Sequence, residues 1–137
     1  MKNIIQKSMF VIIASVCFFA ANGYAHHSFP AQYDASKTIT LNGKVTNVEW
    51  TNPHIFIYVD VADTDTGVVE SWALELGGPN ALLRAGWKRN SLKTGDVITV
   101  DGALARDGSN LLNATSIVLD ATGKRMLTAS SRDSNTE

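Results

Sequence analysis

The sequence predicts an all-β fold, a small five-stranded OB-like Greek-key barrel with one short helix between strands three and four. Three observations predict it. Stretches with period-two or β-branched character recur at short intervals, Gly- and Asp-rich turns separate them, and a single helical stretch follows the third strand. An SH3-like barrel is the alternative, but it would not require the helix, and an immunoglobulin-like sandwich would require about seven strands.

The first predicted strand is long and bent. Ile39, Leu41 and Val45 share one parity, whereas Val48 and Trp50 share the other. Because side chains alternate between the two faces of a strand, this change of phase predicts a bulge or sharp bend between Val45 and Val48. A bent first strand can serve both halves of a barrel.

The second and third strands follow a break at residues 51–54, TNPH, where Pro53 lacks a backbone donor. Residues 55–61, IFIYVDV, are β-branched and aromatic, as strands require. After the turn DTDTG, residues 68–76 form the third strand, VVESWALEL. Its alternation places on the core side Trp72, Leu74 and Leu76, and on the other side Ser71, Ala73 and Glu75.

The second half of the chain completes the barrel. The helix is predicted at residues 81–86, ALLRAG, capped by Gly78 or Asn80, with Gly86 at its left-handed exit. The fourth and fifth strands are predicted at residues 97–104, VITVDGAL, and 111–119, LLNATSIVL. The barrel then spans residues 38–122, and the Ser-, Arg- and Asp-rich residues 123–137 form a flexible tail.

The first 25 residues carry the pattern of a cleaved secretory signal peptide. Lys2 and Lys7 precede an apolar stretch over residues 9–21, and Gly23 and Ala25 place small residues before the cut. We therefore expect a protein of the periplasm or the exterior, without an integral membrane segment once the signal is removed. Residues 26–37 then form a polar N-terminal arm.

The composition of the mature chain excludes several classes of protein. Removing the first 25 of the 137 residues leaves enough chain for one domain, with 10 basic and 13 acidic residues. Nothing in this balance suggests binding to nucleic acid. Cys17, the only cysteine, leaves with the signal, so the mature chain has neither a disulfide nor a thiolate metal site.

Four segments together carry a resemblance to a known family: AHHSF, LNGKVTNVEWTNPH, GPNALLRAGWKRNSLKTGD and LARDGSNLLNA. Over roughly residues 25–120 the chain resembles a family of small exported bacterial proteins known only as a domain of unknown function, DUF family 6152. The resemblance implies export and a small β-barrel, and it implies no activity.

The sequence favours a binding protein over an enzyme. It contains no Gly-rich phosphate loop after a strand, and Ser28 beside His27 lacks the turn of a nucleophile elbow. DTDTG has no Glu at the twelfth position from Asp63, which excludes an EF-hand. No general acid–base pair is evident.

Three histidines, His26, His27 and His54, suggest a metal site. After cleavage, the amine and the ring Nδ1 of His26 can chelate one ion. A second imidazole, from His54 or His27, would complete a three-nitrogen set that suits Cu(II) best and Zn(II) less selectively. In an OB-fold, His54 lies in a loop that frames the usual binding face.

Two alternatives remain open. The first is a small-ligand or glycan site on the barrel face, formed by Trp50, Phe56 and Tyr58 with Asn52 and Arg106 in the flanking loops. The second is an accessory subunit that docks on another protein of the cell envelope.

The mature protein should begin at His26, because Gly23 and Ala25 fit the small-residue pockets of signal peptidase. Mass spectrometry of the exported protein measures this start directly. A start at Asn22 or Gly23 would deprive His26 of its free amine and rule out the chelate.

Overall fold

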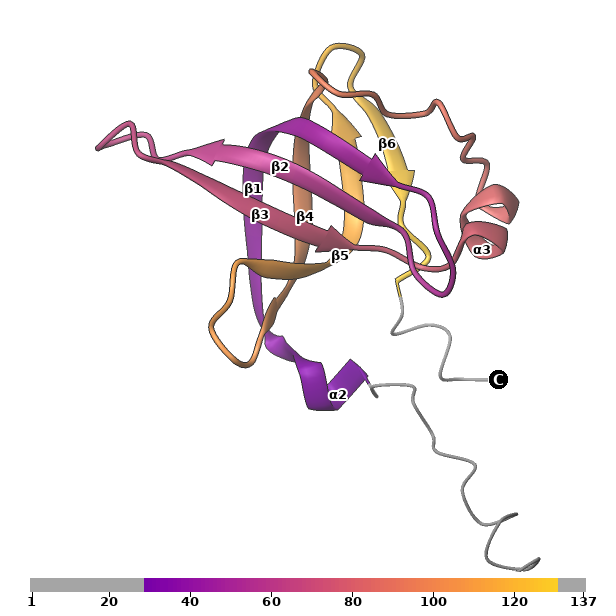
Figure 1. Cartoon of the computed structure of the whole chain (residues 1–137), viewed down its shortest axis with the longest axis horizontal. Helices are drawn as coiled ribbons and strands as arrows, with labels where there is room; N and C mark the ends of the chain where they lie inside the picture. The colour runs from indigo at the N-terminus through magenta and orange to yellow at the C-terminus, as the bar shows by residue number, and fades with distance from the viewer. Residues whose placement is uncertain (1–28, 131–137) are drawn as a thin grey trace, which may run out of the picture.

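The computed structural model describes residues 29–130, and the predicted signal peptide, His26 and His27 lie outside this range. The fold is mostly β, with two short helices (Figure 1). The elements are α2 (Phe29–Gln32), β1 (Tyr33–Glu49), β2 (Phe56–Ala62), β3 (Val69–Glu75), α3 (Pro79–Arg84), β4 (Val97–Ala105), β5 (Leu111–Leu119) and β6 (Lys124–Leu127). The predicted placement of a short helix between the third and fourth strands is confirmed. Neither helix in residues 29–130 is long and apolar enough to cross a membrane.

The strands form one six-stranded sheet in the order β3-β2-β1-β4-β5-β6. All neighbours in this order are antiparallel. In addition, β3 pairs in parallel with β5, through Ala73–Glu75 and Leu111–Asn113. This extra pairing joins β1, β2, β3, β5 and β4 into a partial ring, with β6 outside it.

Strand β1 serves both halves of the ring, as predicted. Its 17 residues pair with β4 along the first part and with β2 along the last part. The β1–β2 register shifts between Val45 and Asn47, which confirms the predicted bulge. The strand begins at Tyr33, however, so that residues 33–37 belong to β1 and not to the arm. The β1–β4 register shifts between Asp34 and Thr38. This shift interrupts the alternation of side chains, so the sequence pattern does not indicate that the strand begins at Tyr33.

The core lies inside the ring. On β2 and the residue before it, Ile55, Ile57 and Val59 are buried, as their alternation predicts. On β3 the core-side row runs from half-buried Trp72 to Leu74, which is fully buried.

The C-terminal part of the described chain is more ordered than predicted. The sequence predicts a flexible tail from residue 123, but residues 124–127 form β6 and pair with β5. Met126 is buried in the main core, and the hydroxyl of Thr128 donates to the carbonyl of Ala114. A four-residue strand with one core side chain has too weak a pattern to stand out in a polar segment.

Two glycines after β3 allow three segments to meet. A Cβ on Gly77 would lie 1.9 Å from the carbonyl oxygen of Ala129, and one on Gly78 would lie 2.7 Å from that of Pro53. The Gly77 N–H also donates to the carbonyl of Thr128 at 3.0 Å. The β1–β2 loop, the end of β3 and the segment after β6 are therefore packed backbone against backbone.

Replacing Leu74 by Ala should lower the free energy of unfolding by about 2–5 kcal/mol, through lost burial and a residual cavity. The measurement is a denaturant melt. Val69→Ala is the matched control, because Val69 lies on the same strand and is 58% exposed. If Leu74→Ala costs no more than the control, Leu74 does not form part of the core.

Candidate functional site

A buried carboxylate, Glu75, connects three distant parts of the chain. Its side chain is 5% exposed although it lies on the face of β3 opposite the core residue Leu74. The hydroxyl of Tyr33 donates to its Oε2 at 2.5 Å, and the Nδ1 of His54 lies 2.9 Å from its Oε1. Within residues 29–130, no Lys or Arg forms an ion pair with this carboxylate.

The end of the β2–β3 ladder places His54 beside Glu75. Phe56 pairs with Glu75, and His54 lies two residues earlier, so its side chain shares their face of the sheet. The ladder continues past the strand ends, because the Leu76 N–H donates to the carbonyl of Ile55 at 2.9 Å. His54 and Glu75 are thus diagonal neighbours across two strands, within reach of a hydrogen bond.

The two ring nitrogens of His54 have different environments. Nδ1 is close enough to donate to Glu75, whereas Nε2 has no hydrogen-bond partner within the described part of the chain. The side chain is 25% exposed. With Nδ1–H bonded to a carboxylate, a neutral imidazole presents the lone pair of Nε2, the arrangement found in many metal-binding histidines.

His54 and Glu75 do not form a metal site by themselves. Among residues 29–130, no group of three or more His, Cys, Asp or Glu side chains could hold an ion. The other predicted ligands, His26 and His27, lie outside the described residues. A metal at His54 would therefore need further ligands from outside the described residues.

Tyr33 is the second partner of Glu75, and it is nearly inaccessible to solvent, with 1% of its surface exposed. Its ring centroid lies 5.4 Å from that of Phe29, on the one-turn helix α2. Burial, and then the hydrogen bond to Glu75, raise the pKa of the Tyr33 phenol far above its usual value. Tyr33 therefore remains a neutral donor to the carboxylate.

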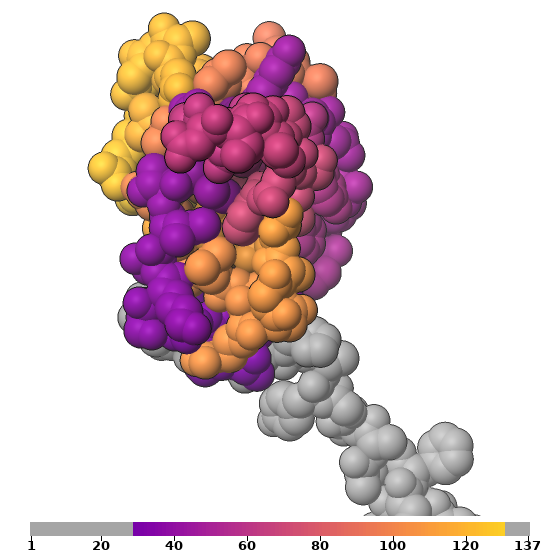
Figure 2. All heavy atoms as spheres, turned by 90° about the vertical axis from the view of Figure 1, so that its left-hand side faces the viewer, coloured from indigo at the N-terminus to yellow at the C-terminus, as the bar shows by residue number. Residues whose placement is uncertain are grey.

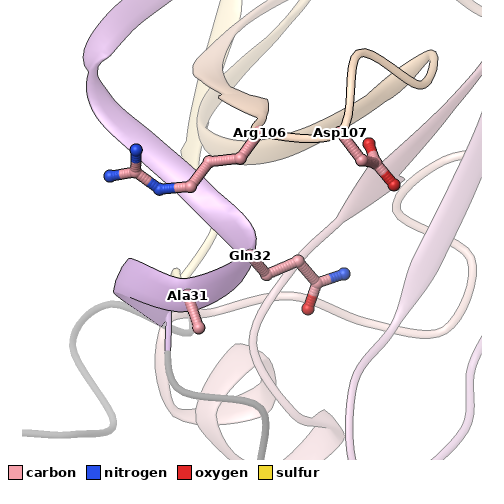
Figure 3. Close-up of a pocket in the computed structure, with 4 residues that line it drawn as sticks. All are labelled: Ala31, Gln32, Arg106 and Asp107. Atoms are coloured by element: carbon pink, nitrogen blue, oxygen red, sulfur yellow. The ribbon is translucent and has the colours of Figure 1, made fainter.

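Arg106 holds α2 against the β4–β5 turn. Its Nε donates to the carbonyl of Pro30 at 2.9 Å, and its backbone N–H donates to that of Gln32 at 2.9 Å. Its Nη1 lies 3.6 Å from the carboxylate of Asp34. Figure 3 shows the guanidinium directed away from Asp107. Both residues line a pocket of about 490 Å³ together with Ala31 and Gln32. Arg106, which the sequence predicts as a ligand-binding residue, thus connects the start of the described chain to the β4–β5 turn.

The predicted aromatic face contains one stacked pair. The rings of Phe56 and Tyr58 lie 6.5 Å apart at 24°, and the Tyr58 hydroxyl donates to Glu49 at 3.2 Å. Both aromatic side chains are half-buried, and Asn52 is exposed in the β1–β2 loop.

Trp50 has a different environment from this pair. It packs against the main core, with the guanidinium of Arg89 5.9 Å from its ring centroid. Its Nε1 is buried and has no hydrogen-bond partner within residues 29–130.

Sequence reasoning missed Glu75 and Tyr33. Alternation placed Glu75 on the outward face of β3, and that assignment is correct, but it could not show that other residues bury this position. A local signal existed, because Glu75 lies between two core leucines, Leu74 and Leu76, and Gly77–Gly78 follow directly after them. For Tyr33 the sequence predicts a place in a polar arm, whereas the structure places it at the start of β1.

Comparison with known families identifies the chain. The model of a family of unknown function, DUF6152, matches residues 13–113, well over half of the sequence. The chain belongs to this family. The match to DUF6152 includes Tyr33, His54 and Glu75 together with His26 and His27, and it confirms the resemblance drawn from the four sequence segments. No curated protein matches the sequence.

Tyr33→Phe should lower the free energy of unfolding by about 1–3 kcal/mol, because it leaves a buried oxygen of Glu75 without its donor. Tyr58→Phe is the control, because its partner Glu49 is exposed and water can replace the lost bond. Denaturant melts compare the two variants. Equal losses would show that the Tyr33–Glu75 bond contributes nothing beyond an exposed one.

Tyr33→Phe should also change how the stability of the protein depends on pH. The pKa of Tyr33 is raised in the folded state, so its contribution to stability is complete below the ordinary value of 10 and is lost as the pH rises above it. Wild-type protein should therefore lose stability more steeply than Tyr33→Phe above about pH 10. Parallel slopes would contradict this assignment.

Proposed function

We propose that this protein is an exported, non-enzymatic metal-binding protein of the cell envelope, built on an open barrel of the OB type. Its metal is Cu(II). The ligands are the amine and ring Nδ1 of His26, which becomes the N-terminus after cleavage, and Nε2 of His54. His27 lies beside the site and contributes less.

The observation that carries the proposal is the contact between His54 and Glu75. A ligating histidine generally donates its other N–H to a carboxylate or carbonyl, which fixes the ring and makes the ligating nitrogen more basic. The 2.9 Å separation of His54 Nδ1 and Glu75 Oε1 fits this role. It supports Nε2 as the ligating atom.

The negative charge of Glu75 supports the binding of a cation beside His54. A buried carboxylate is stable when it is paired with a cation or hydrogen-bonded on both oxygens. Glu75 has two hydrogen-bonding neighbours, Tyr33 and His54, and the described chain offers it no Lys or Arg. A metal ion on His54 would place positive charge one imidazole away from this carboxylate.

The described structure anchors the chain close to this site. Phe29 packs on Tyr33, and the hydroxyl of Tyr33 bonds to the carboxylate that contacts His54. His26 lies only three positions before Phe29 in the sequence, and an extended chain spans at most about 3.6 Å per residue. This short connection to Phe29 supports the proposal that His26 and His54 bind the same metal ion.

The choice of metal follows from the ligand chemistry. The set is one amine and two imidazoles, with no thiolate in the mature chain. Neutral nitrogen ligands in a plane favour Cu(II) over the other divalent first-row ions.

Metal-free protein beginning at His26 should bind one Cu(II), as measured by calorimetry and by electron paramagnetic resonance. One alanine added before His26 should remove most of the affinity, because it converts the amine into an amide. His54→Ala should weaken binding and change the spectrum, while His27→Ala should have a smaller effect. Binding that is equally tight in the extended protein would disprove the chelate.

Glu75→Gln tests the role of the carboxylate in the same experiment. Loss of an outer partner of a metal ligand typically costs 10–100-fold in affinity. Glu49→Gln is the matched control, since Glu49 is an exposed carboxylate on the same sheet. If both variants bind Cu(II) alike, His54 does not ligate through Nε2 with support from Glu75.

A further inference from the structure

The inner surface of the ring is open at the end opposite the His54 site. Strand β3 pairs with β5 only from Ala73 onward, so Val69–Trp72 pair with β2 alone among the described strands. In Figure 1 the β2–β3 hairpin projects beyond the other strands at this end. Figure 2 looks onto this end, with the hairpin toward the viewer.

A groove of about 440 Å³ lies at this opening, a volume typical of small-molecule sites. Its lining comes from β1, β2, β3 and the turn between β2 and β3. The lining residues are Leu41, Val61, Asp63, Thr66, Val68, Glu70 and Trp72.

The floor of the groove is an extension of the core. Leu41, Val61 and Trp72 are partly buried and pack against the main core cluster. Val68, at the rim, is 58% exposed and adds apolar surface beside this floor. The indole of Trp72 offers both apolar area and a π-face.

Among the described residues that line the groove, only Asp63 and Glu70 are charged, and both are carboxylates. Val61 and Glu70 are paired across the β2–β3 ladder, so Glu70 lies on the core-facing side of β3, in the same row as Trp72 and Leu74. Asp63 is held in place by the N–H and hydroxyl of Thr66, at 2.7 and 2.8 Å. These hydrogen bonds lower the pKa of Asp63, so it remains ionised.

The distribution of basic residues along the chain also favours an acidic groove. No Lys or Arg occurs between Val45 and Leu83, a stretch that contains β2, the hairpin turn and β3. A basic side chain is also absent from the described lining of the groove. An apolar floor with an aromatic ring and an acidic rim is complementary to a cation with an apolar body.

We propose that this groove binds a small hydrophobic organic cation, with the apolar body against Leu41, Val61 and Trp72 and the cationic group between Asp63 and Glu70. The site is separate from the proposed copper site and does not depend on it. It assigns a function to Trp72 and Glu70 that core packing alone would not require.

Benzyltrimethylammonium is a suitable probe, because its charge does not change with pH. Metal-free full-length mature protein, with chelator present, is titrated by calorimetry and by NMR of the tryptophan indole N–H signals. The signal that disappears in Trp72→Phe identifies Trp72. We expect saturable binding that shifts the Trp72 signal, and weaker binding of neutral benzyl alcohol.

Glu70→Gln should weaken binding of the cation by about fivefold, with little effect on benzyl alcohol. Glu49→Gln is the matched control and should leave both affinities unchanged, since Glu49 lies outside the groove. No saturable binding, or shifts confined to Trp50 and Trp87, would overturn the proposal. In that case Glu70 serves only as an inward-pointing charge that protects a sheet edge from association.

Equal weakening by both glutamate variants would also overturn it, because it would indicate general attraction to an acidic protein. Sedimentation without the probe adds a further outcome. If two copies of the chain associate and Val68→Ser abolishes the dimer, a second copy and not an organic cation occupies the groove.

Discussion

The partial ring of five strands depends on one short ladder, the parallel pairing of Ala73–Glu75 with Leu111–Asn113. Without it the chain would form an open antiparallel sheet with its apolar face exposed to water. Three residues of pairing are enough because Leu74 and Leu112, the facing residues in that register, are both fully buried in the same core cluster. Hydrophobic burial thus stabilises the ladder, and the ladder holds the two halves of the core together.

The position of this ladder gives the two ends of the ring different chemistry. At the closed end, the strands come close enough for a tyrosine, a histidine and a glutamate from three elements to share one buried hydrogen-bonded group. At the other end β3 is paired only with β2, and the inner apolar surface reaches solvent beside Asp63 and Glu70. A buried carboxylate and an exposed apolar floor are each costly features in a small domain. Their presence at opposite ends is the basis for the two separate binding roles that we propose.

Local patterns in the sequence predicted the parts of the fold that depend on neighbouring residues. The alternation of Ile55, Ile57 and Val59 gave the correct core face of β2, and the phase change between Val45 and Val48 gave the bulge in β1. The extra strand at Lys124–Leu127 was not predicted, because its stability comes from pairing with β5 and not from its own composition. Residues 33–37 were missed for the same reason, since pairing with β4 defines the start of β1.

The candidate site was predictable only in part. A loop histidine after a proline is visible in the sequence, and so is its place between two strands. The partner of His54 was not, because Glu75 is buried and accepts a hydrogen bond from Tyr33, which lies 42 positions away in the chain. Contacts across such separations depend on topology, and period-two alternation contains no information about which distant residue covers an outward side chain.

The many contacts between distant residues also determine when the fold can form. Tyr33 pairs with Ala105, and Gly77 bonds to Thr128. A chain growing from its N-terminus therefore cannot complete either contact until most of the domain has been synthesised. Topologies dominated by such pairings fold slowly, on the order of milliseconds to seconds. The bond from Gly77 to Thr128 in particular cannot form before residue 128 has been synthesised, so the packing at the end of β3 is completed only by the last part of the described chain.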